Sequence, residues 1–197
     1  MAYKCDNGIV YELDQNMHTA KITSSSKTSS VVIVPKFIEH ESNQFLITTI
    51  DSFAFRRNMS IESLKFAPDS SLLRICENAF IDSSIQNLSI PESLTELDAN
   101  WCYGASYLTK IDVDPRNKNF VFIDEKFLIK IDKNRNFEDL IFTRRDVKGE
   151  IIIPGSVKRL CSSSFFNCHQ LESISSFSEN SMLEVIENLT FNDEKFT

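Results

Sequence analysis

The stretch that decides the fold is residues 154–174, which read PGSVKRLCSSSFFNCHQLESI. In it an aliphatic residue, Leu160, is followed by three variable residues, a small residue and then Phe165. The same frame occurs at 50–55, 75–80 and 186–191, and in a degenerate form at 97–102. A unit that recurs in this way predicts a repeat architecture, in which each unit packs against its neighbours.

The spacing between units indicates the class of repeat. Ile50, Ile75 and Leu97 are 25 and 22 residues apart, and Leu160 and Ile186 are 26 apart, which is within the range of leucine-rich repeats. The structural anchors of the repeat are the residues that open and close the frame: Ile50, Phe55, Ile75, Phe80, Leu97, Leu160, Phe165, Ile186 and Phe191. We expect the regularly spaced Phe residues to form the core of a solenoid.

An apolar trio follows the frame and predicts a strand. Ile85, Leu88 and Ile90 are one example, and their last two members alternate as in a short strand with one face inward. The Phe segment must then be the turn or short helix that returns the chain. The sequence therefore predicts a β-rich solenoid with short helical or 3-10 turns.

This frame resembles the BspA-like leucine-rich repeats. Their consensus runs roughly Ile-Pro-x-Ser-Val-x-x-Ile-Gly-x-x-Ala-Phe-x-x-Cys-x-x-Leu-x-x-Ile, and residues 154–174 come close to it. The chain departs from it at Cys76 and Cys161, where the consensus has Gly, and at Trp101-Cys102, which replace Ala-Phe. The resemblance implies a leucine-rich-repeat solenoid, a curved right-handed array with an N-terminal β cap and a β-hairpin insertion.

The expected organisation has four parts. Residues 1–46 read as a strand-rich cap, because an open solenoid end needs a cover. Residues 47–115 and 151–197 are leucine-rich repeats. Residues 116–150 break the period, and their alternating apolar runs predict a β-hairpin or small meander.

The last repeat, after Phe191, is incomplete, since its strand trio is missing. An uncapped repeat end exposes apolar surface. We therefore expect one of two situations: the chain pairs with another copy through this end, as a homo-oligomer, or it is a fragment of a longer protein.

Composition excludes several classes of function. The net charge of −7 argues against nucleic acid as a partner, and the lack of an apolar stretch of 18 residues argues against membrane insertion. The five cysteines are odd in number and form no CxxC pair, which favours reduced thiols. Localisation stays unknown at this level: no signal peptide or transmembrane segment is evident, whereas the family resemblance suggests a cell-surface or secreted protein.

Three groups of residues could carry chemistry: Cys161, Cys168 and His169; His18 and His40; and Asp112, Asp114, Asp124 and Glu125. The cysteine spacing matches no zinc pattern, the histidines belong to no catalytic motif, and the acidic residues lack EF-hand spacing. We therefore expect that the chain is not an enzyme and that it has no catalytic residue, metal or cofactor. The glycosylation sequons at Asn58, Asn87 and Asn188 matter only if the chain enters a secretory route.

The candidate binding residues are the polar residues interleaved with the strand trio: Ser63, Lys65, Asn87, Ser89, Lys110, Asp112, Ser173 and Ser175. On a period-two strand they share the face opposite the core, and stacking would join them into a polar ladder. A merely solvated sheet face is the alternative. The resemblance implies a non-enzymatic interaction or adhesion module of the surface-antigen type that binds a protein or glycan. The alternative is a self-assembling structural protein that stacks through its incomplete C-terminal repeat.

Overall fold

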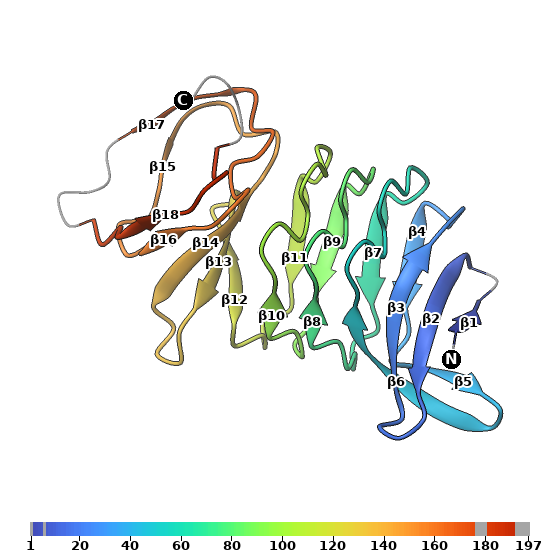
Figure 1. Ribbon diagram of the computed structural model, residues 1–197. Helices are drawn as coiled ribbons and strands as arrows, with labels where there is room; N and C mark the ends of the chain where they lie inside the picture. Colours follow the sequence, from blue (N-terminus) through green and yellow to red (C-terminus); the bar gives the residue numbers. More distant parts are fainter. Residues whose placement is uncertain (1, 6, 176–180, 192–197) are drawn as a thin grey trace.

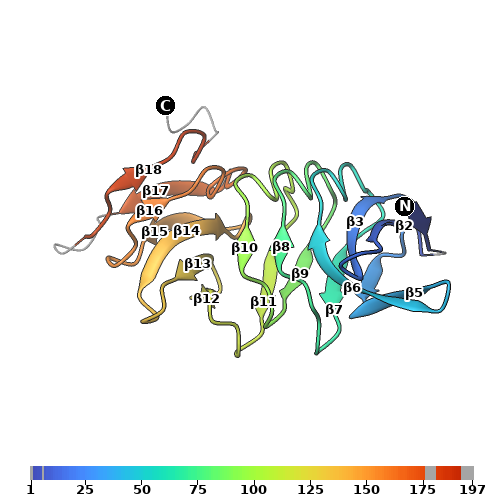
Figure 2. The same ribbon diagram turned by 60° about the horizontal axis from the view of Figure 1, so that its bottom comes forward.

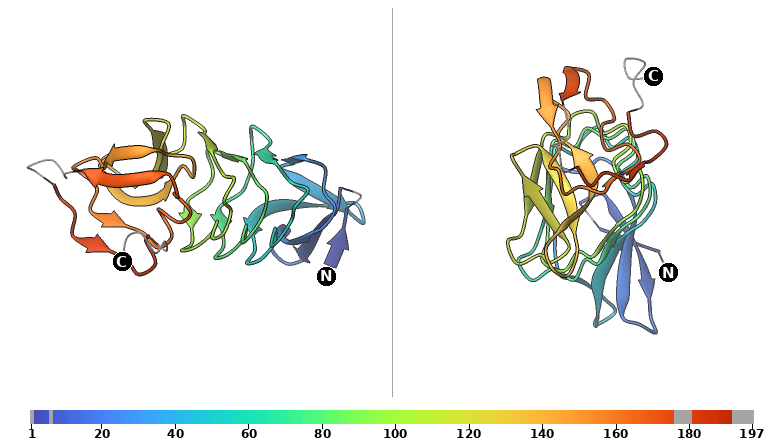
Figure 3. Two further views of the ribbon diagram at one scale, coloured as in Figure 1. Left: turned by 90° about the horizontal axis from the view of Figure 1, so that it is seen from above. Right: turned by 90° about the vertical axis from the view of Figure 1, so that its left-hand side faces the viewer.

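The computed structural model describes residues 2–5, 7–175 and 181–191, which wind into a β-solenoid of about seven turns. The solenoid is elongated, with β1 and β18 at opposite ends (Figure 1, Figure 3). These residues form eighteen β-strands and no helix. The predicted β-rich solenoid is confirmed, but the helical or 3-10 turns expected at the Phe segments do not occur in the described ranges.

The Phe segments are turns because each contains a residue in the left-handed backbone conformation. It stands three positions after the anchor, and its φ lies between 57° and 64°. The residues at this position are Phe53, Asn78, Asn100, Ser163 and Leu189. A helix needs negative φ at every residue, so this position prevents one.

Each repeat turn contributes strands to two sheets, between which the core lies. We call the first the anchor sheet, since it carries Ile50, Ile75 and Leu97 in parallel register. Its strands are β1 (Ala2–Lys4), β2 (Ile9–Asp14), β3 (Thr19–Ser25), β5 (Phe37–His40), β6 (Asn43–Ile50), β8 (Arg74–Ile75) and β10 (Glu96–Leu97). Figure 2 shows β6, β8 and β10 in a row.

The second sheet, which we call the ladder sheet, contains the apolar trios of the sequence. Its strands are β4 (Val31–Val34), β7 (Ser63–Phe66), β9 (Asn87–Ile90) and β11 (Lys110–Val113). They are all parallel and follow the order β11-β9-β7-β4. Leu64, Leu88 and Ile111 stand in one row and are buried, so this sheet supplies one wall of the core.

The first 50 residues combine an antiparallel part with a coil of the solenoid. Strands β1, β2 and β3 are antiparallel neighbours, and β5 pairs antiparallel with β6. However, β3 also pairs parallel with β6, and β4 pairs parallel with β7. Residues 19–34 therefore stack on the next coil in the manner of a repeat, and the β1–β2 hairpin extends the anchor sheet beyond them.

A three-stranded antiparallel meander interrupts the array. It consists of β12 (Phe120–Ile123), β13 (Phe127–Ile131) and β14 (Phe137–Thr143). Leu128 and Phe142 pack into the core on the side of the first repeats, whereas Phe127, Ile129 and Leu140 pack into a second core cluster. The meander is thus a wall that is buried on both sides.

The array resumes from the last strand of the meander. Strand β14 pairs parallel with β16 (Arg159–Leu160), which pairs parallel with β18 (Val185–Ile186). On the other side, β15 (Gly149–Ile152) pairs parallel with β17 (Leu171–Ser175) in a separate two-stranded sheet.

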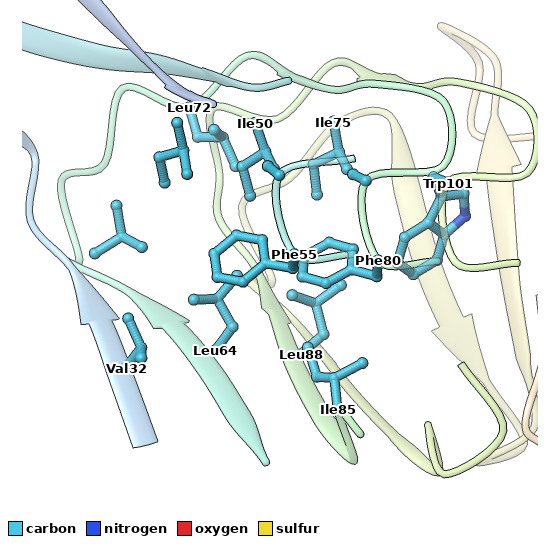
Figure 4. Packing of buried hydrophobic residues seen from close by; sticks show 14 of the residues in the cluster. Val32, Ile50, Phe55, Leu64, Leu72, Ile75, Phe80, Ile85, Leu88 and Trp101 are labelled. Carbon is cyan, nitrogen blue, oxygen red and sulfur yellow. The ribbon is translucent and has the colours of Figure 1, made fainter. Parts of the chain in front are cut away.

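A column of aromatic rings runs through the core. Phe55 and Phe80 are stacked with centroids 5.1 Å apart, and Trp101 meets Phe80 edge-on at 6.1 Å. Figure 4 shows these three rings between the aliphatic side chains of the two sheets. The indole of the degenerate repeat therefore fills the space that Phe fills elsewhere, and Phe142 of the meander follows it at 6.1 Å.

The anchors differ in burial along the array. Six of them are buried: Ile50, Phe55, Ile75, Phe80, Leu160 and Phe165. Leu97 and Phe191 are half-buried, and Phe191 stacks on Phe165 with centroids 5.1 Å apart. Ile186, on the last strand, is 54% exposed.

Buried Asn117 fixes the entry to the meander. Its amide nitrogen donates to the backbone oxygens of Pro91 (2.7 Å) and Leu94 (3.1 Å). Its amide oxygen accepts from the backbone nitrogens of Asn119 and Phe120. The side chain is therefore both donor and acceptor, and it links the meander to the preceding coil.

We expect Asn117→Asp to lower the free energy of unfolding by about 3 kcal/mol at pH 7, because a buried carboxylate cannot donate to these carbonyl oxygens. Burial against carbonyl oxygens raises the pKa of a carboxyl group above its unfolded value. The loss of stability should therefore grow as the pH rises from the unfolded to the folded pKa of the introduced carboxyl group, and it should be small near pH 4. Urea unfolding at both pH values checks this, and an equal loss at both would contradict it.

Candidate functional site

The outer face of the ladder sheet brings six of the eight predicted binding residues together. Ser63, Asn87 and Lys110 are Cα partners in successive strands, and Ser89 is the partner of Asp112. Lys65 lies on β7, two residues after Ser63. Figure 1 shows the four strands side by side. The predicted stacking of these positions is therefore present in this sheet.

The six side chains differ in how accessible they are. Lys65, Lys110 and Asp112 are exposed, and Lys110 pairs with Asp112 at 3.5 Å. Asn87 and Ser89 are half-buried, and the Ser89 hydroxyl accepts a hydrogen bond from the backbone nitrogen of Phe66. Ser63 is only 6% exposed, so its hydroxyl does not form part of an open polar surface as the alternating pattern suggested.

The other two predicted residues lie elsewhere. Ser173 and Ser175 belong to β17, where their partners are Glu150 and Ile152 of β15. Ser173 is exposed. Since β15 and β17 form a separate sheet, these two positions do not continue the rows of the ladder sheet.

Two aliphatic residues extend the rows where the sequence pattern suggested only polar ones. Val31 is the Cα partner of Ser63, and Ile33 is the partner of Lys65. Their exposed fractions are 49% and 63%. The alternation of Val31–Val34 carried this signal, but these residues fall in the segment interpreted as a cap.

A hollow of about 250 Å³ borders β11 at the other end of the ladder sheet. Its lining includes Asp112, Asp114 and Phe122, together with Arg135 of the meander. The Arg116 guanidinium, 2.9 Å from the Asp114 carboxylate, holds the pKa of that carboxyl below its usual value. Asp114 is thus already partnered within the chain.

The opposite face of the solenoid is dominated by ion pairs. On the anchor sheet Lys21 contacts Glu12 and Asp51, both at 3.1 Å, and Arg74 contacts Asp98 at 2.9 Å. Farther along, Arg159 contacts Asp139 at 3.4 Å and Glu187 at 3.2 Å. Charges on this face therefore neutralise one another, whereas the ladder sheet leaves more of its polar groups open.

A small cavity of about 150 Å³ lies between β10 and the second part of the array. Asn100 spans this junction, because its side-chain oxygen accepts from the hydroxyls of Ser162 (3.0 Å) and Ser163 (2.6 Å). Trp101 and Cys161 also line it. Burial raises the pKa of the Cys161 thiol to about 12, so it stays protonated at neutral pH.

The other cysteine and histidine residues considered as chemical groups are buried or contact aromatic rings. Cys168 is buried; Cys102, which departs from the repeat consensus, is buried as well, and burial raises the pKa of its thiol to about 11. The ring of His18 contacts Phe45, and that of His40 contacts Tyr3. Within the described residues no three His, Cys, Asp or Glu side chains gather as metal ligands, and Cys76, Cys102 and Cys161 are free thiols.

The acidic residues considered for calcium binding and the asparagines of the glycosylation sequons lie in different parts of the fold. Asp124 and Glu125 form the turn between β12 and β13, both with φ of 51°. Asn58 is buried and its amide donates to Ser25 and Thr28, whereas Asn188 is exposed. The described part of the chain contains no helix whose length and apolar character would let it span a membrane.

Comparison with known proteins identifies the repeat. The profile of the BspA type leucine rich repeat region matches residues 36–140 and 135–197, in six copies. A search of curated proteins finds no match. The match begins inside the segment that the sequence pattern assigned to a cap, which agrees with the repeat-like stacking of β6 and β7 on β3 and β4.

Solved structures of bacterial leucine-rich repeat proteins are similar to this chain. A leucine-rich repeat protein from Eubacterium ventriosum is 18% identical with a TM-score of 0.53, over 94% of this chain and 61% of that chain. A leucine rich cell surface protein from Faecalibacterium prausnitzii is 14% identical with a TM-score of 0.43, over 95% of this chain and 76% of that chain. The first of these supports the fold alone.

The profile match covers more than half of the chain and includes both the regular and the degenerate repeats. Repeat proteins of this kind are typically non-enzymatic, and the family suggests an interaction or surface module. The chain belongs to the BspA-type leucine-rich repeat family.

Proposed function

We propose that the chain is a non-enzymatic interaction or adhesion module that binds a macromolecule, a protein or glycan, through the outer face of the ladder sheet. The observation that carries the proposal is the in-register stacking of outward side chains from β4, β7, β9 and β11. Four parallel strands hold these side chains at fixed spacing, so a partner can meet a flat and preorganised surface.

The contrast between the two faces supports the choice of the ladder sheet. A partner that bound the anchor sheet would have to compete with ion pairs such as Arg74 with Asp98. The ladder sheet offers Lys65, which forms no ion pair with another described residue, and the uncharged amide of Asn87, beside the aliphatic Ile33. An interface combines apolar contact with polar groups that can still form hydrogen bonds, and this face supplies both.

The proposal can be tested on an array of purified matrix proteins and glycans. The double variant Asn87→Arg with Lys110→Glu changes the size and charge of the face. Ser173→Arg is the matched control, because Ser173 is exposed on a separate sheet. We expect the wild-type chain and the control to bind the same array members and the double variant to lose them. No binding by the wild-type chain, or equal binding by all three, would argue against the proposal.

We propose self-assembly through the last coil as a second candidate function. Ile186 is 54% exposed, whereas its counterpart Ile75 is fully buried. Val185 and Leu189, beside it, are 38% and 55% exposed. Among the described strands β18 pairs only with β16, which leaves one edge open.

Light scattering over a range of concentrations tests the second candidate. Stacking predicts a mass that rises with concentration and a monomer for Ile186→Glu. Ile152→Glu is the control, since Ile152 is 64% exposed on another strand. A monomer at every concentration would rule this candidate out and leave face binding as the remaining proposal.

A further inference from the structure

Strand β4 is the free edge of the ladder sheet. Among the described strands it pairs with β7 alone, whereas the neighbouring β3 is followed in the anchor sheet by β2 and β1. Figure 1 shows the hairpin of β1 and β2 beyond β3. The N-terminal hairpin therefore covers the end of one sheet only.

The backbone of β4 has one row of hydrogen-bonding groups that β7 does not use. The carbonyl oxygen of Ser30 accepts from the backbone nitrogens of Glu62 and Ser63, and that of Val34 accepts from the backbone nitrogen of Ala67. Because neighbouring residues of a strand direct their amide and carbonyl groups to opposite sides, those of Val31 and Ile33 face away from β7. The Ser29 hydroxyl contacts the Val31 oxygen at 2.6 Å, which leaves this carbonyl a second lone pair.

The side chains of this edge lack the usual protection against pairing. Soluble proteins commonly place charged residues, proline or a bulge on an edge strand. In β4 the outward residues are Val31 and Ile33, and its register with β7 is regular. By contrast, the edge strand β15 carries exposed Glu150 and a register shift beside it.

A lysine stands next to these aliphatic residues. Lys65 is the Cα partner of Ile33 and is exposed, and it forms no ion pair with any other described residue. Adjacent strands are about 4.8 Å apart, so the long Lys65 side chain can lie across Ile33 toward the free edge. The edge thus combines free backbone groups, two β-branched side chains and one unpaired positive charge.

We infer that β4 docks an extended peptide segment of a protein partner, which adds to the ladder sheet as a further strand. An extended chain matches a row of amide and carbonyl groups at strand spacing, whereas a glycan does not. Aliphatic residues of the segment would cover Val31 and Ile33, and an acidic residue would pair with Lys65. This inference rests on the proposed function and specifies how the partner binds.

The test uses the whole chain and a fluorescently labelled eight-residue peptide, Thr-Val-Thr-Glu-Thr-Val-Thr-Glu, which places valine and glutamate together on one face of an extended strand. We expect fluorescence polarisation to show binding, and the same peptide with lysine in place of glutamate to bind at least about tenfold more weakly, because Lys65 repels it. Ile33→Lys should weaken binding of the glutamate peptide at least about tenfold. Ile152→Lys is the matched control, since Ile33 and Ile152 are 63% and 64% exposed on edge strands.

Unfolding of each variant, followed by the fluorescence of Trp101, shows whether it is folded. If Ile33→Lys is unfolded, Lys65→Glu takes its place, with Lys130→Glu as its control, since Lys130 is exposed on β13, outside the ladder sheet. Absence of peptide binding, or equal binding by the edge variant and its control, overturns edge docking. In a further outcome, the Asn87→Arg, Lys110→Glu variant loses binding to the purified proteins and glycans while the edge variant still binds them. In that outcome the proposed function stands and strand addition is wrong.

Discussion

Replacement of Phe80 by Ala is expected to lower the free energy of unfolding by about 3–5 kcal/mol. The ring is fully buried, stacked on Phe55 and in edge contact with Trp101. Truncation removes these contacts and leaves a cavity in a core whose coils are held in register by backbone hydrogen bonds. Since native stability is commonly 5–15 kcal/mol, this is a large share of the total.

The control for Phe80 is Phe53, in the preceding turn. Phe53 is 48% exposed, so Phe53→Ala should change the free energy of unfolding by no more than about 0.5 kcal/mol. Urea unfolding followed by the fluorescence of Trp101 measures both variants. Similar losses for the two would mean that the aromatic column is not the main source of core stability.

Replacement of Arg145 by Ala is expected to lower the free energy of unfolding by about 3 kcal/mol or more. Arg145 is 4% exposed, and its guanidinium lies 4.6 Å from the centre of the Phe142 ring. It donates to the backbone oxygens of Ser163 and Ser164, both at 3.3 Å. Without it, these buried oxygens lose a hydrogen-bond donor, and a cavity is left at the junction between the meander and the following coil.

The neighbouring Arg144 provides the control for this prediction. It is partly exposed and pairs with Asp146, so Arg144→Ala should lower the free energy of unfolding by less than about 1 kcal/mol. Thermal unfolding of the two variants at equal concentration compares them. If Arg144→Ala is the more destabilised, the buried guanidinium does not hold this junction.

The repeat fold could be predicted from the sequence because its signal is apolar and periodic. The trio Ile85, Leu88 and Ile90 recurs in several units, and its strand is present as β9. The two-residue strands β8 and β10 were not predicted, since each contributes one inward residue and so shows no alternation. Their pairing depends on the coils stacking, which is a tertiary effect.

Other features depend on contacts between distant parts of the chain. The left-handed position of each turn holds residues as different as Phe53, Asn78 and Leu189, so residue type does not reveal it. In β13 the residues Phe127–Ile129 are all buried, because the meander has a core on each side. Alternation fails as a signal where both faces of a strand are covered.

The candidate site was predicted only in part, for reasons of the same kind. The rows of the ladder sheet follow from period-two alternation and stacking, and they place Asn87 beside Lys110. Ser63 is buried and has Val31 and Asn87 as its neighbours in the row; its burial was not predicted, since Val31 was interpreted as part of a cap and not as a strand of this sheet. Ser173 and Ser175 lie in another sheet because the meander ends the ladder sheet at β11.

The central claim is that a partner binds the ladder sheet. The rate of lysine acetylation, measured with and without a bound protein or glycan from the purified set, tests this claim most directly, because the chain carries lysines on both faces. Lys65 and Lys110 lie on the ladder sheet, whereas Lys21 lies on the anchor sheet and Lys158 next to β16. Binding through the ladder sheet predicts that the ligand slows acetylation of Lys65 and Lys110 and leaves Lys21 and Lys158 unchanged. Protection of Lys21 and Lys158 instead, with Lys65 and Lys110 still reactive, would contradict it.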